Sequence, residues 1–574
     1  MTKFIAPALL ILFLAPAARA ADPWWKHAVI YEIYPRSFQD SNADGIGDLK
    51  GIESRLGYLS DLGVDAIWIS PMYPSPQVDF GYDIADYEAV DPQYGTLADM
   101  DRLIDQARPK HIRVVLDMVL NHTSDRHRWF MAAASSRTDP KHDWYVWSDG
   151  KPGAGPGAHE GRLPPNNWIS LFGGSAWEWV PAVHQYYYHF FYKQQPDLNW
   201  RNPAVEKAMF GSIRFWLDRG VAGFRLDAIT TLFEDPGLHD ARELGGTNAQ
   251  GDPRLDDALV TGLPEVHDLL RRLRALVDSY PDDRALIGEV YLPDTQSLDA
   301  WYGGAKQDEL QLPMDMAFGF HGDHDKLDVV AFRNRIEEAQ NLPHGGQPLF
   351  VFDNHDNVRS VNRYGDGVHD ARISKILATL LLTSRATALM YYGEELDMIT
   401  TTPTRREDVK DPIGITGWPK EKGRDGERTP MQWDAGPQAG FSSATMTWLP
   451  IPSSHRKINV ETESSDSQSA LRWYRELIAL RRTQPALRDG AITMLDRSNT
   501  HVLSYLRRTD SGEAVIVAMN FTAQPQKISL DLSGSGAASS AVRTLLTDAP
   551  ELRRASTAQG LSLPPYATWI AKLR

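Results

Sequence analysis

The chain has 574 residues, of which 42% are hydrophobic and 24% are charged. This composition is that of a globular protein with room for two or three domains, and it excludes a disordered chain. The 75 acidic and 60 basic residues give a net charge of −15, which argues against nucleic acid and anionic membranes as partners. The chain contains no cysteine, which excludes disulfides, thiol nucleophiles and cysteine-ligated metal sites.

Residues 1–20 have the pattern of a secretory signal peptide. Lys3 precedes an apolar run at 4–14, and residues 18–20 form a small-x-small cleavage site. An N-terminal membrane anchor is the alternative, but a run interrupted by Pro7 is too short for a span of about 20 residues. We therefore expect an exported protein, periplasmic or extracellular, with no membrane partner.

Short apolar runs alternate with helix-period stretches over most of the chain. The predicted strands are 29–33, 66–69, 112–116, 221–226, 285–287, 309–312, 348–352 and 388–391. Helical patterns lie between them, for example at 205–218, 266–278 and 372–383. This order predicts an α/β fold, a (β/α)8 TIM barrel, with a doubly wound sheet as the alternative.

Two further domains are expected beside the barrel. The segment between the third and fourth strands is too long for one loop and helix, which indicates a small inserted domain at 123–197. The barrel then comprises 21–122 and 198–489. After a helical stretch the pattern changes to alternation and turns, which predicts an antiparallel β-sandwich at 490–574.

Three acidic residues follow apolar lead-ins that read as buried strands: Asp227, Glu289 and Asp356. An acid at the end of a buried strand costs free energy to desolvate unless it is paired or hydrogen-bonded. Acids so far apart in the sequence can meet at the C-terminal face of a barrel, where such enzymes hold their chemistry. The three acids are therefore the candidate catalytic residues.

Further motifs occur in a fixed order around these acids. In chain order they are Gly81-Tyr-Asp-Ile-Ala-Asp-Tyr87, Asp117-Met-Val-Leu-Asn-His122, Gln195-Pro-Asp-Leu-Asn199, the three acid segments, Tyr391-Tyr-Gly-Glu-Glu395 and Gly423-Arg-Asp-Gly-Glu-Arg-Thr-Pro-Met-Gln-Trp433. Together they resemble glycoside hydrolase family 13, the α-amylase family, and within it the α-glucosidase and oligo-1,6-glucosidase group. The resemblance covers nearly the whole chain after residue 20.

The resemblance implies a role for each acid. Asp227 would be the nucleophile that forms a β-glucosyl enzyme, and Glu289 the acid that protonates the leaving oxygen and then activates water. Asp356 would bind sugar hydroxyls and stabilise the distorted ring. Arg225 lies two residues before Asp227, on the same face of a strand, where it should lower the pKa of that carboxyl.

Other residues are assigned to the first sugar subsite by the same resemblance. His122 and His355 would donate hydrogen bonds to the sugar, and Tyr82 would be its stacking platform. Phe172 is a candidate for the wall of the cleft. For a lone buried histidine, the alternative is a satisfied core residue.

A pair of opposite charges resembles the one that closes this subsite in exo-acting members. Asp79 and Arg424 would grip the distal hydroxyls of a terminal glucose, although Arg428 competes with Arg424 for this role. A surface ion pair is the alternative. In this group alanine or threonine after the nucleophile accompanies α-1,4 activity and valine α-1,6 activity, so Ala228 predicts α-1,4 preference.

One segment has the spacing of a metal loop. From Asp40 to Asp48, oxygen-bearing side chains alternate with other residues and Gly45 provides the sharp turn, as in an EF-hand. By resemblance the ligands are Asp40, Asn42, Asp44, the Ile46 carbonyl and Asp48. Structural Ca²⁺ is the first candidate, with Mg²⁺ as a second, because Gly51 stands where an EF-hand has a bidentate glutamate. The alternative is a loop braced by Asx turns.

The leading hypothesis is an exported, retaining exo-α-glucosidase that acts on maltose, short malto-oligosaccharides and sucrose, with capacity for transglucosylation. It would need no organic cofactor, its partners would be small α-glucosides, and it would be a monomer or a weak homo-oligomer. Related alternatives are an oligo-1,6-glucosidase, a sucrose isomerase or trehalose synthase type of glucosyl transferase, and an endo-amylase. A catalytically inactive sugar-binding homologue is disfavoured by the intact acids.

Overall fold

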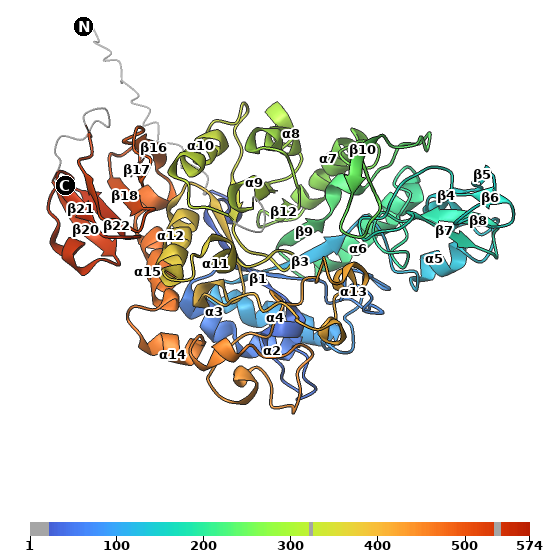
Figure 1. Cartoon of the computed structure of the whole chain (residues 1–574), viewed down its shortest axis with the longest axis horizontal. Helices are drawn as coiled ribbons and strands as arrows, with labels where there is room; N and C mark the ends of the chain where they lie inside the picture. Colours follow the sequence, from blue (N-terminus) through green and yellow to red (C-terminus); the bar gives the residue numbers. More distant parts are fainter. Residues whose placement is uncertain (1–21, 321–324, 533–540) are drawn as a thin grey trace, which may run out of the picture.

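The computed structural model describes residues 22–320, 325–532 and 541–574. A central barrel has a small aromatic-rich domain on one side and a sheet domain formed by the C-terminal part of the chain on the other (Figure 1). The predicted signal peptide, residues 1–20, lies outside the described residues. Among the helices in the described part of the chain, none is both long and apolar enough to cross a membrane.

Eight parallel strands close into the barrel in the order β1-β15-β14-β13-β12-β9-β3-β2. They are β1 (Val29–Ile33), β2 (Ala66–Ile69), β3 (Arg113–Val119), β9 (Gly223–Asp227), β12 (Ala285–Gly288), β13 (Leu312–Asp315), β14 (Leu349–Val351) and β15 (Thr387–Tyr391). Closure excludes the doubly wound sheet, because such a sheet has two open edges. The predicted TIM barrel is confirmed.

The sixth barrel strand lies three residues later than the sequence predicts. The prediction of 309–312 ends before Pro313, a residue type that is unfavourable inside a strand. In the structure, Pro313 is within β13 and pairs with Gly288 of β12. The residues before it serve another purpose, since Glu309 accepts hydrogen bonds from His267 and Arg271.

Helices cover the outside of the barrel. The longer ones are α3 (Leu56–Leu62), α4 (Leu97–Ala107), α6 (Pro203–Asp218), α7 (Glu265–Asp278), α10 (Val329–Gln340), α12 (Asp370–Thr383) and α15 (Ala470–Thr483). Helix α6 begins before its predicted start because Asn202 caps its first turn and Pro203 takes the first position, where no amide donor is needed. In α4, Thr96 and Asp99 form a capping box.

Short helices connect these elements. They are α1 (Pro35–Phe38), α2 (Leu49–Ser54), α5 (Arg128–Ala133), α8 (Leu298–Trp301), α9 (Met316–Gly319), α11 (Ser360–Tyr364), α13 (Pro412–Gly417), α14 (Val460–Ser465) and α16 (Pro485–Arg488). Helix α13 positions the loop that carries Arg424, since Asp411 caps its N-terminus and also binds that arginine.

The barrel interior is filled by side chains from most of its strands. A buried apolar cluster includes Ile30, Trp68, Val115, Ile287 and Leu389. A larger cluster packs the outer strand faces against the helices. Residues at the C-terminal ends of the strands are therefore held by a rigid, close-packed support.

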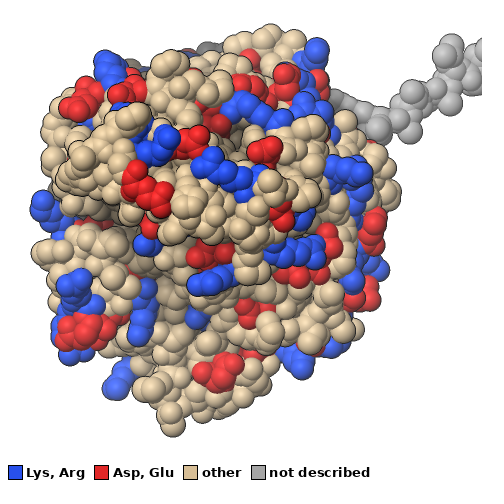
Figure 2. Space-filling model, turned by 90° about the vertical axis from the view of Figure 1, so that its right-hand side faces the viewer, with Lys and Arg blue, Asp and Glu red and all other residues tan. Residues whose placement is uncertain are grey.

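The inserted domain follows β3 and is built from small sheets and aromatic side chains. Its strands are β4 (Trp147–Ser148), β5 (Lys151–Pro152), β6 (Arg162–Leu163), β7 (Trp177–Val180) and β8 (Gln185–Tyr188). Tyr186 and Tyr188 are buried in its core. On the face shown in Figure 2, acidic and basic side chains are interspersed and do not gather by sign.

Beyond β9, the chain forms an outlying hairpin, β10 (Glu243–Thr247) and β11 (Pro253–Leu255).

The C-terminal domain has a five-stranded antiparallel sheet and a two-stranded sheet. Its strands are β16 (Ala491–Leu495), β17 (Val502–Arg508), β18 (Ala514–Asn520), β19 (Gln526–Ile528), β20 (Val542–Thr547), β21 (Leu561–Leu563) and β22 (Thr568–Leu573). Both sheets contribute to one apolar core, as the sandwich prediction requires.

Candidate active site

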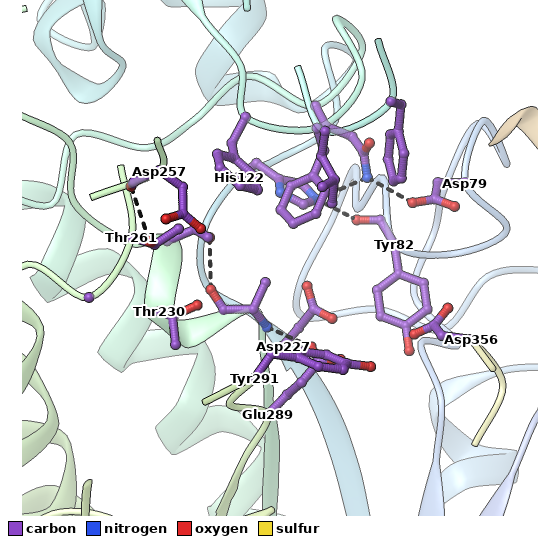
Figure 3. A pocket seen from close by; sticks show the side chains of 18 of the residues that line it. Asp79, Tyr82, His122, Asp227, Thr230, Asp257, Thr261, Glu289, Tyr291 and Asp356 are labelled. Atoms are coloured by element: carbon purple, nitrogen blue, oxygen red, sulfur yellow. Dashed lines mark hydrogen bonds between the residues drawn. The ribbon is translucent and has the colours of Figure 1, made fainter. Parts of the chain in front are cut away.

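A cavity of about 690 Å³ opens where the barrel strands end and the inserted domain begins. The predicted site residues that line it are Asp79, Tyr82, His122, Phe172, Asp227, Ala228, Glu289, Asp356 and Arg424. Figure 3 shows Asp227 and Glu289 close together, with Asp356 and Tyr82 beside them. Two further residues predicted to act in the sugar site, Arg225 and His355, do not line it and are buried behind it.

Arg225 joins two of the three acids. Its Nη1 donates to Asp227 Oδ1 at 2.7 Å, and its Nη2 lies 2.8 Å from Glu289 Oε2. The amide of Ala228 also donates to that Glu289 oxygen at 2.9 Å. Glu289 therefore has one oxygen held by donors and the other available to carry a proton.

The two carboxyls share a shifted titration. Burial raises the pKa of Asp227 to about 7, and Arg225 lowers it by less than burial and the neighbouring acids raise it. Our expectation of a lowered pKa is thus wrong, because the desolvation of a buried carboxyl exceeds the effect of one guanidinium. Burial likewise raises the pKa of Glu289 to about 7. Such a pair titrates as a unit and holds one proton over an interval of pH.

This titration predicts a bell-shaped pH profile. We expect kcat/KM for maltose to fall as the pH rises through about 7, because Glu289 then loses the proton for the leaving oxygen. On the acid side it should fall as the pair takes up a second proton and Asp227 becomes neutral. Initial rates between about pH 4 and 9 test both limbs. With α-glucosyl fluoride, whose leaving group needs no proton, a persisting alkaline limb would contradict the assignment to Glu289.

Asp356, unlike Asp227 and Glu289, has a lowered pKa. Its Oδ1 accepts hydrogen bonds from Arg424 at 2.7 Å and from Arg428 at 2.8 Å. Although burial raises the pKa of Asp356, Arg424 and Arg428 hold it well below its usual range. This carboxylate is ionised at any pH at which the protein works, so it can only accept hydrogen bonds.

Arg424 is the centre of the predicted charge pair. Its Nη2 donates to Asp79 Oδ1 at 2.8 Å, and its Nε donates to Asp411 Oδ2 at 2.8 Å. Arg428 contacts Asp356 and the carbonyl of His355 and does not line the cavity, so Arg424 is the partner of Asp79. We did not predict Asp411, although an aspartate before Pro412 is a signal for a helix cap.

A fourth acid lies beneath the site. Asp117 on β3 is wholly buried and accepts hydrogen bonds from Arg225, from the Trp68 indole and from the Tyr82 hydroxyl. Burial raises its pKa to about 6, while Arg225 lowers it. The sequence places Asp117 in a motif without a role. Its position shows that it holds Arg225 and Tyr82 in place.

The protonation of His122 follows from its neighbours. The Asn121 amide nitrogen donates to Asp197 and to a backbone carbonyl, so its oxygen faces His122 Nδ1 at 2.8 Å and accepts from it. Burial lowers the pKa of His122 to about 3, so the ring is neutral. Its Nε2 lies 3.1 Å from the amide nitrogen of Gln195 and 3.1 Å from the carbonyl oxygen of Tyr82, and the Gln195 amide also donates to Asp79 at 3.2 Å. Gln195, in a motif noted above, is a further cavity residue.

Two residues shape the cavity wall. Ala228 has φ 43° and ψ 38°, a left-handed conformation that side chains branched at Cβ disfavour. Phe172 stacks on Tyr192 with ring centroids 4.1 Å apart. The guanidinium carbon of Arg424 lies 5.9 Å from the centre of the Phe172 ring. The wall is thus fixed by backbone geometry at one point and by aromatic packing at another.

The predicted metal loop is braced by its own hydrogen bonds. Asp40 accepts from the amides of Asn42, Ala43 and Gly45. Asp48 accepts from the Ser41 amide and hydroxyl. The Asx turns of the alternative are therefore present. The exposed oxygens of Asn42 and Asp44 are hard donors of the kind that Ca²⁺ prefers, so the residue types fit that ion.

The fold and the site define the class of this protein. A closed (β/α)8 barrel with paired carboxyls in a cavity at its strand ends is the arrangement of a glycoside hydrolase. The family models agree: residues 32–490 match "Alpha amylase, catalytic domain" and residues 492–570 match "Maltogenic Amylase, C-terminal domain". The chain belongs to the α-amylase family, glycoside hydrolase family 13.

Several individual proteins of known sequence or structure are similar to this chain. A "Probable alpha-glucosidase" of Rhizobium meliloti (strain 1021) is 44% identical over 509 residues, covering 87% of this chain and 89% of that protein. An "Oligo-1,6-glucosidase" of Heyndrickxia coagulans is 37% identical, covering 87% of this chain and 92% of that protein. A crystal structure of an "alpha-glucosyl transfer enzyme" aligns with a TM-score of 0.83 and 38% identity, covering 96% of this chain and all of that one.

Proposed function

We propose that the protein is a retaining exo-α-glucosidase that releases α-glucose from the non-reducing ends of maltose and short malto-oligosaccharides, and from sucrose. The observation that carries the proposal is the shared guanidinium of Arg225, which holds Asp227 and Glu289 together in a cavity bounded by the Asp79–Arg424 pair. Relatives described as α-glucosidases are consistent with it.

In the proposed reaction, Asp227 attacks the anomeric carbon while Glu289 protonates the departing oxygen, which leaves a β-glucosyl ester on Asp227. Glu289, now ionised, takes a proton from water, which attacks the same carbon and restores the free carboxylate. Asp356 accepts hydrogen bonds from sugar hydroxyls while the ring distorts. Two displacements retain the α configuration.

Exo action is proposed from the position of the charge pair. Asp79 and Arg424 line the same cavity as the catalytic acids, and Asp411 fixes the arginine from outside. A charged pair there provides both donors and acceptors for the hydroxyls of a terminal glucose. Transglucosylation is part of the proposal because a glucosyl enzyme also reacts with alcohols, and a structural relative is described as a glucosyl transfer enzyme.

A substrate panel tests this function. The protein without residues 1–20 is incubated with maltose, isomaltose, maltotriose, sucrose and starch, and the products are separated by anomer. We expect α-glucose as the first product and faster turnover of maltose than of isomaltose or starch. Faster isomaltose turnover would favour the oligo-1,6-glucosidase alternative, isomerised sucrose or maltose would favour a transferase, and internal cleavage of starch would favour an endo-amylase.

Ala228 is proposed as the linkage filter. Ala228→Val should shift the ratio of kcat/KM for maltose over isomaltose toward isomaltose by about 10-fold. Ala228→Thr is the matched control, because threonine has the same branched shape at the same left-handed backbone position and should keep maltose preference. If the two variants show the same ratio as the parent chain, Ala228 does not set the linkage.

We further propose that the loop at 40–48 binds a structural Ca²⁺. Binding to the folded state alone stabilises a protein by about 2.7 kcal/mol at a ligand concentration 100 times Kd. Chelation should therefore lower Tm, and added Ca²⁺ should restore it, with activity retained while the protein stays folded. Asp44→Ala should remove this response, since Asp44 is an exposed ligand candidate. Loss of activity on chelation at unchanged Tm would contradict a structural role.

Export to the periplasm or the medium is also proposed, on the pattern of residues 1–20. A secreted protein whose N-terminus is Ala21 would agree with cleavage after Ala20. We propose a monomer or a weak homo-oligomer, which sedimentation at several concentrations measures.

A further inference from the structure

A buried glutamate on β1 has no role in the reaction proposed above. Glu32 is wholly buried, and its Oε1 lies 2.5 Å from Nδ1 of His355. Its other oxygen, Oε2, has no hydrogen-bond partner among the described residues. An isolated carboxylate oxygen in such a place is costly, so the protonation state of this pair is informative.

The opposite side of the imidazole faces the active site. Nε2 of His355 lies 3.2 Å from Asp356 Oδ2 and 2.7 Å from the hydroxyl oxygen of Tyr82. The Tyr82 hydroxyl donates its own hydrogen to Asp117. Asp356 is an ionised carboxylate and can only accept. Nε2 must therefore carry a hydrogen, since a lone pair there would face two acceptors.

The remaining question is where the proton between Nδ1 and Glu32 lies. If it lay on His355, the ring would be a buried cation. Asp356 would favour that charge, but burial and the nearby Arg428, Arg225 and Arg424 oppose it, so that the pKa of His355 lies well below its usual range. Glu32 would then be ionised with Oε2 unpartnered. If the proton lies on Glu32, both groups are neutral and Nδ1 accepts its hydrogen bond. Burial raises the pKa of Glu32 and lowers that of His355, which agrees with the neutral pair.

Aromatic packing fixes the orientation of the His355 ring. Tyr34 stacks on the imidazole with centroids 5.7 Å apart, and Trp68 meets its edge at 6.0 Å. The ring is almost fully buried, so it cannot turn to exchange its two nitrogens without displacing these neighbours. The tautomer is consequently decided by the donor at Nδ1.

We propose that Glu32 is a positioning residue, a neutral carboxylic acid that donates to Nδ1 of His355 and so holds the Nε2–H tautomer that supports Asp356 and Tyr82. The imidazole Nε2–H fixes Asp356 Oδ2 from one side, while the two arginines hold Oδ1 from the other. The inference rests on the role proposed for Asp356. Turnover of maltose by the unaltered protein tests the proposed function, and a comparison of Glu32 variants tests only Glu32.

Two variants separate the neutral acid from an ionised one. In Glu32→Gln, the amide nitrogen can donate to Nδ1, so we expect kcat for maltose within about three-fold of the parent chain. In Glu32→Met, nothing donates to Nδ1, and we expect kcat to fall by about 10- to 100-fold. KM should change less than kcat, because hydrogen bonds to the sugar hydroxyls strengthen in the transition state.

Stability is measured in parallel to separate positioning from packing. Glu395→Met is the matched control. Glu395 is also a fully buried carboxyl, and within the described ranges one of its oxygens has no hydrogen-bond partner, but it binds Tyr31 and Tyr58. We expect it to lower Tm with little change in kcat. If Glu32→Met does not fold, Glu32→Asp replaces it, because its shorter side chain cannot reach Nδ1 and should lose as much activity.

Three results would overturn the inference. Glu32→Gln could lose as much activity as Glu32→Met, which would show that the negative charge of Glu32 matters. Glu32→Met, or Glu32→Asp in its place, could keep full activity. The loss could also appear in KM with kcat unchanged, which would mean that Asp356 is not the group supported.

Discussion

Asp227→Ala is expected to lower kcat/KM for a nitrophenyl α-glucoside by about 10⁴- to 10⁶-fold, because loss of a nucleophile removes the covalent route. The cavity that the shorter side chain leaves can admit a small anion beside Arg225. Azide should therefore restore turnover and give β-glucosyl azide, since it attacks from the side on which Asp227 stood. Polarimetry or NMR of the product gives the anomer.

Glu289→Ala provides the complementary test. Glycosylation of Asp227 by an activated aryl glucoside should be affected less than cleavage of maltose, for which we expect a loss of about 10²- to 10⁴-fold. Azide should speed release of the glucosyl enzyme, and the product should be α-glucosyl azide, because the anion attacks from the opposite face. The same anomer from both variants would show that the two roles are assigned wrongly.

Arg424→Met is the second change with a large expected effect. It leaves Asp79, Asp411 and Asp356 without their common partner. Truncating one member of a buried, hydrogen-bonded charge pair costs about 2–5 kcal/mol, so kcat/KM for maltose should fall by about 30-fold or more. Tm should also fall, because Asp411 is fully buried and would be unpaired. Arg424→Lys should recover part of each loss, since it keeps the charge but lacks the fork of donors.

The control for this prediction lies nearby in the sequence. Arg405 forms an exposed ion pair with Asp408, so Arg405→Met should leave both kcat/KM and Tm nearly unchanged.

Exo action is checked separately with a malto-oligosaccharide blocked at its non-reducing end. We expect the parent chain to leave it intact, because we propose that the Asp79–Arg424 pair grips the distal hydroxyls of a terminal glucose. Rapid cleavage of the blocked substrate would contradict this use of the pair.

Several parts of the site were predictable because their signals are local in the sequence. An acid at the end of an apolar run marks a strand end in a barrel, and this placed Asp227, Glu289 and Asp356 in one cavity. Arg225 was found through its spacing from Asp227. The sixth strand was placed three residues too early, and the residue concerned is again local. Proline is unfavourable inside a strand, but Pro313 lies within β13 and pairs with Gly288.

Other features depend on contacts that no local pattern contains. Asp79 and Arg424 are separated by 345 residues, and Glu32 and His355 by 323. The αL conformation of Ala228 is decided by the turn after β9. Asp411, Gln195 and Asp117 went unassigned because their roles are to hold another side chain. Each such role exists only once the partner is in place.

The sequence by itself determined the barrel, the three acids and the family, because hydrophobic period and strand-end acids are written in neighbouring residues. Only the tertiary structure decided which arginine meets Asp79 and how the acids titrate. The pKa of Asp227 is raised to about 7, and that of Asp356 is lowered, although both are acids of the same kind beside arginines. Desolvation and the sum of surrounding charges set these values, and both are properties of the folded chain.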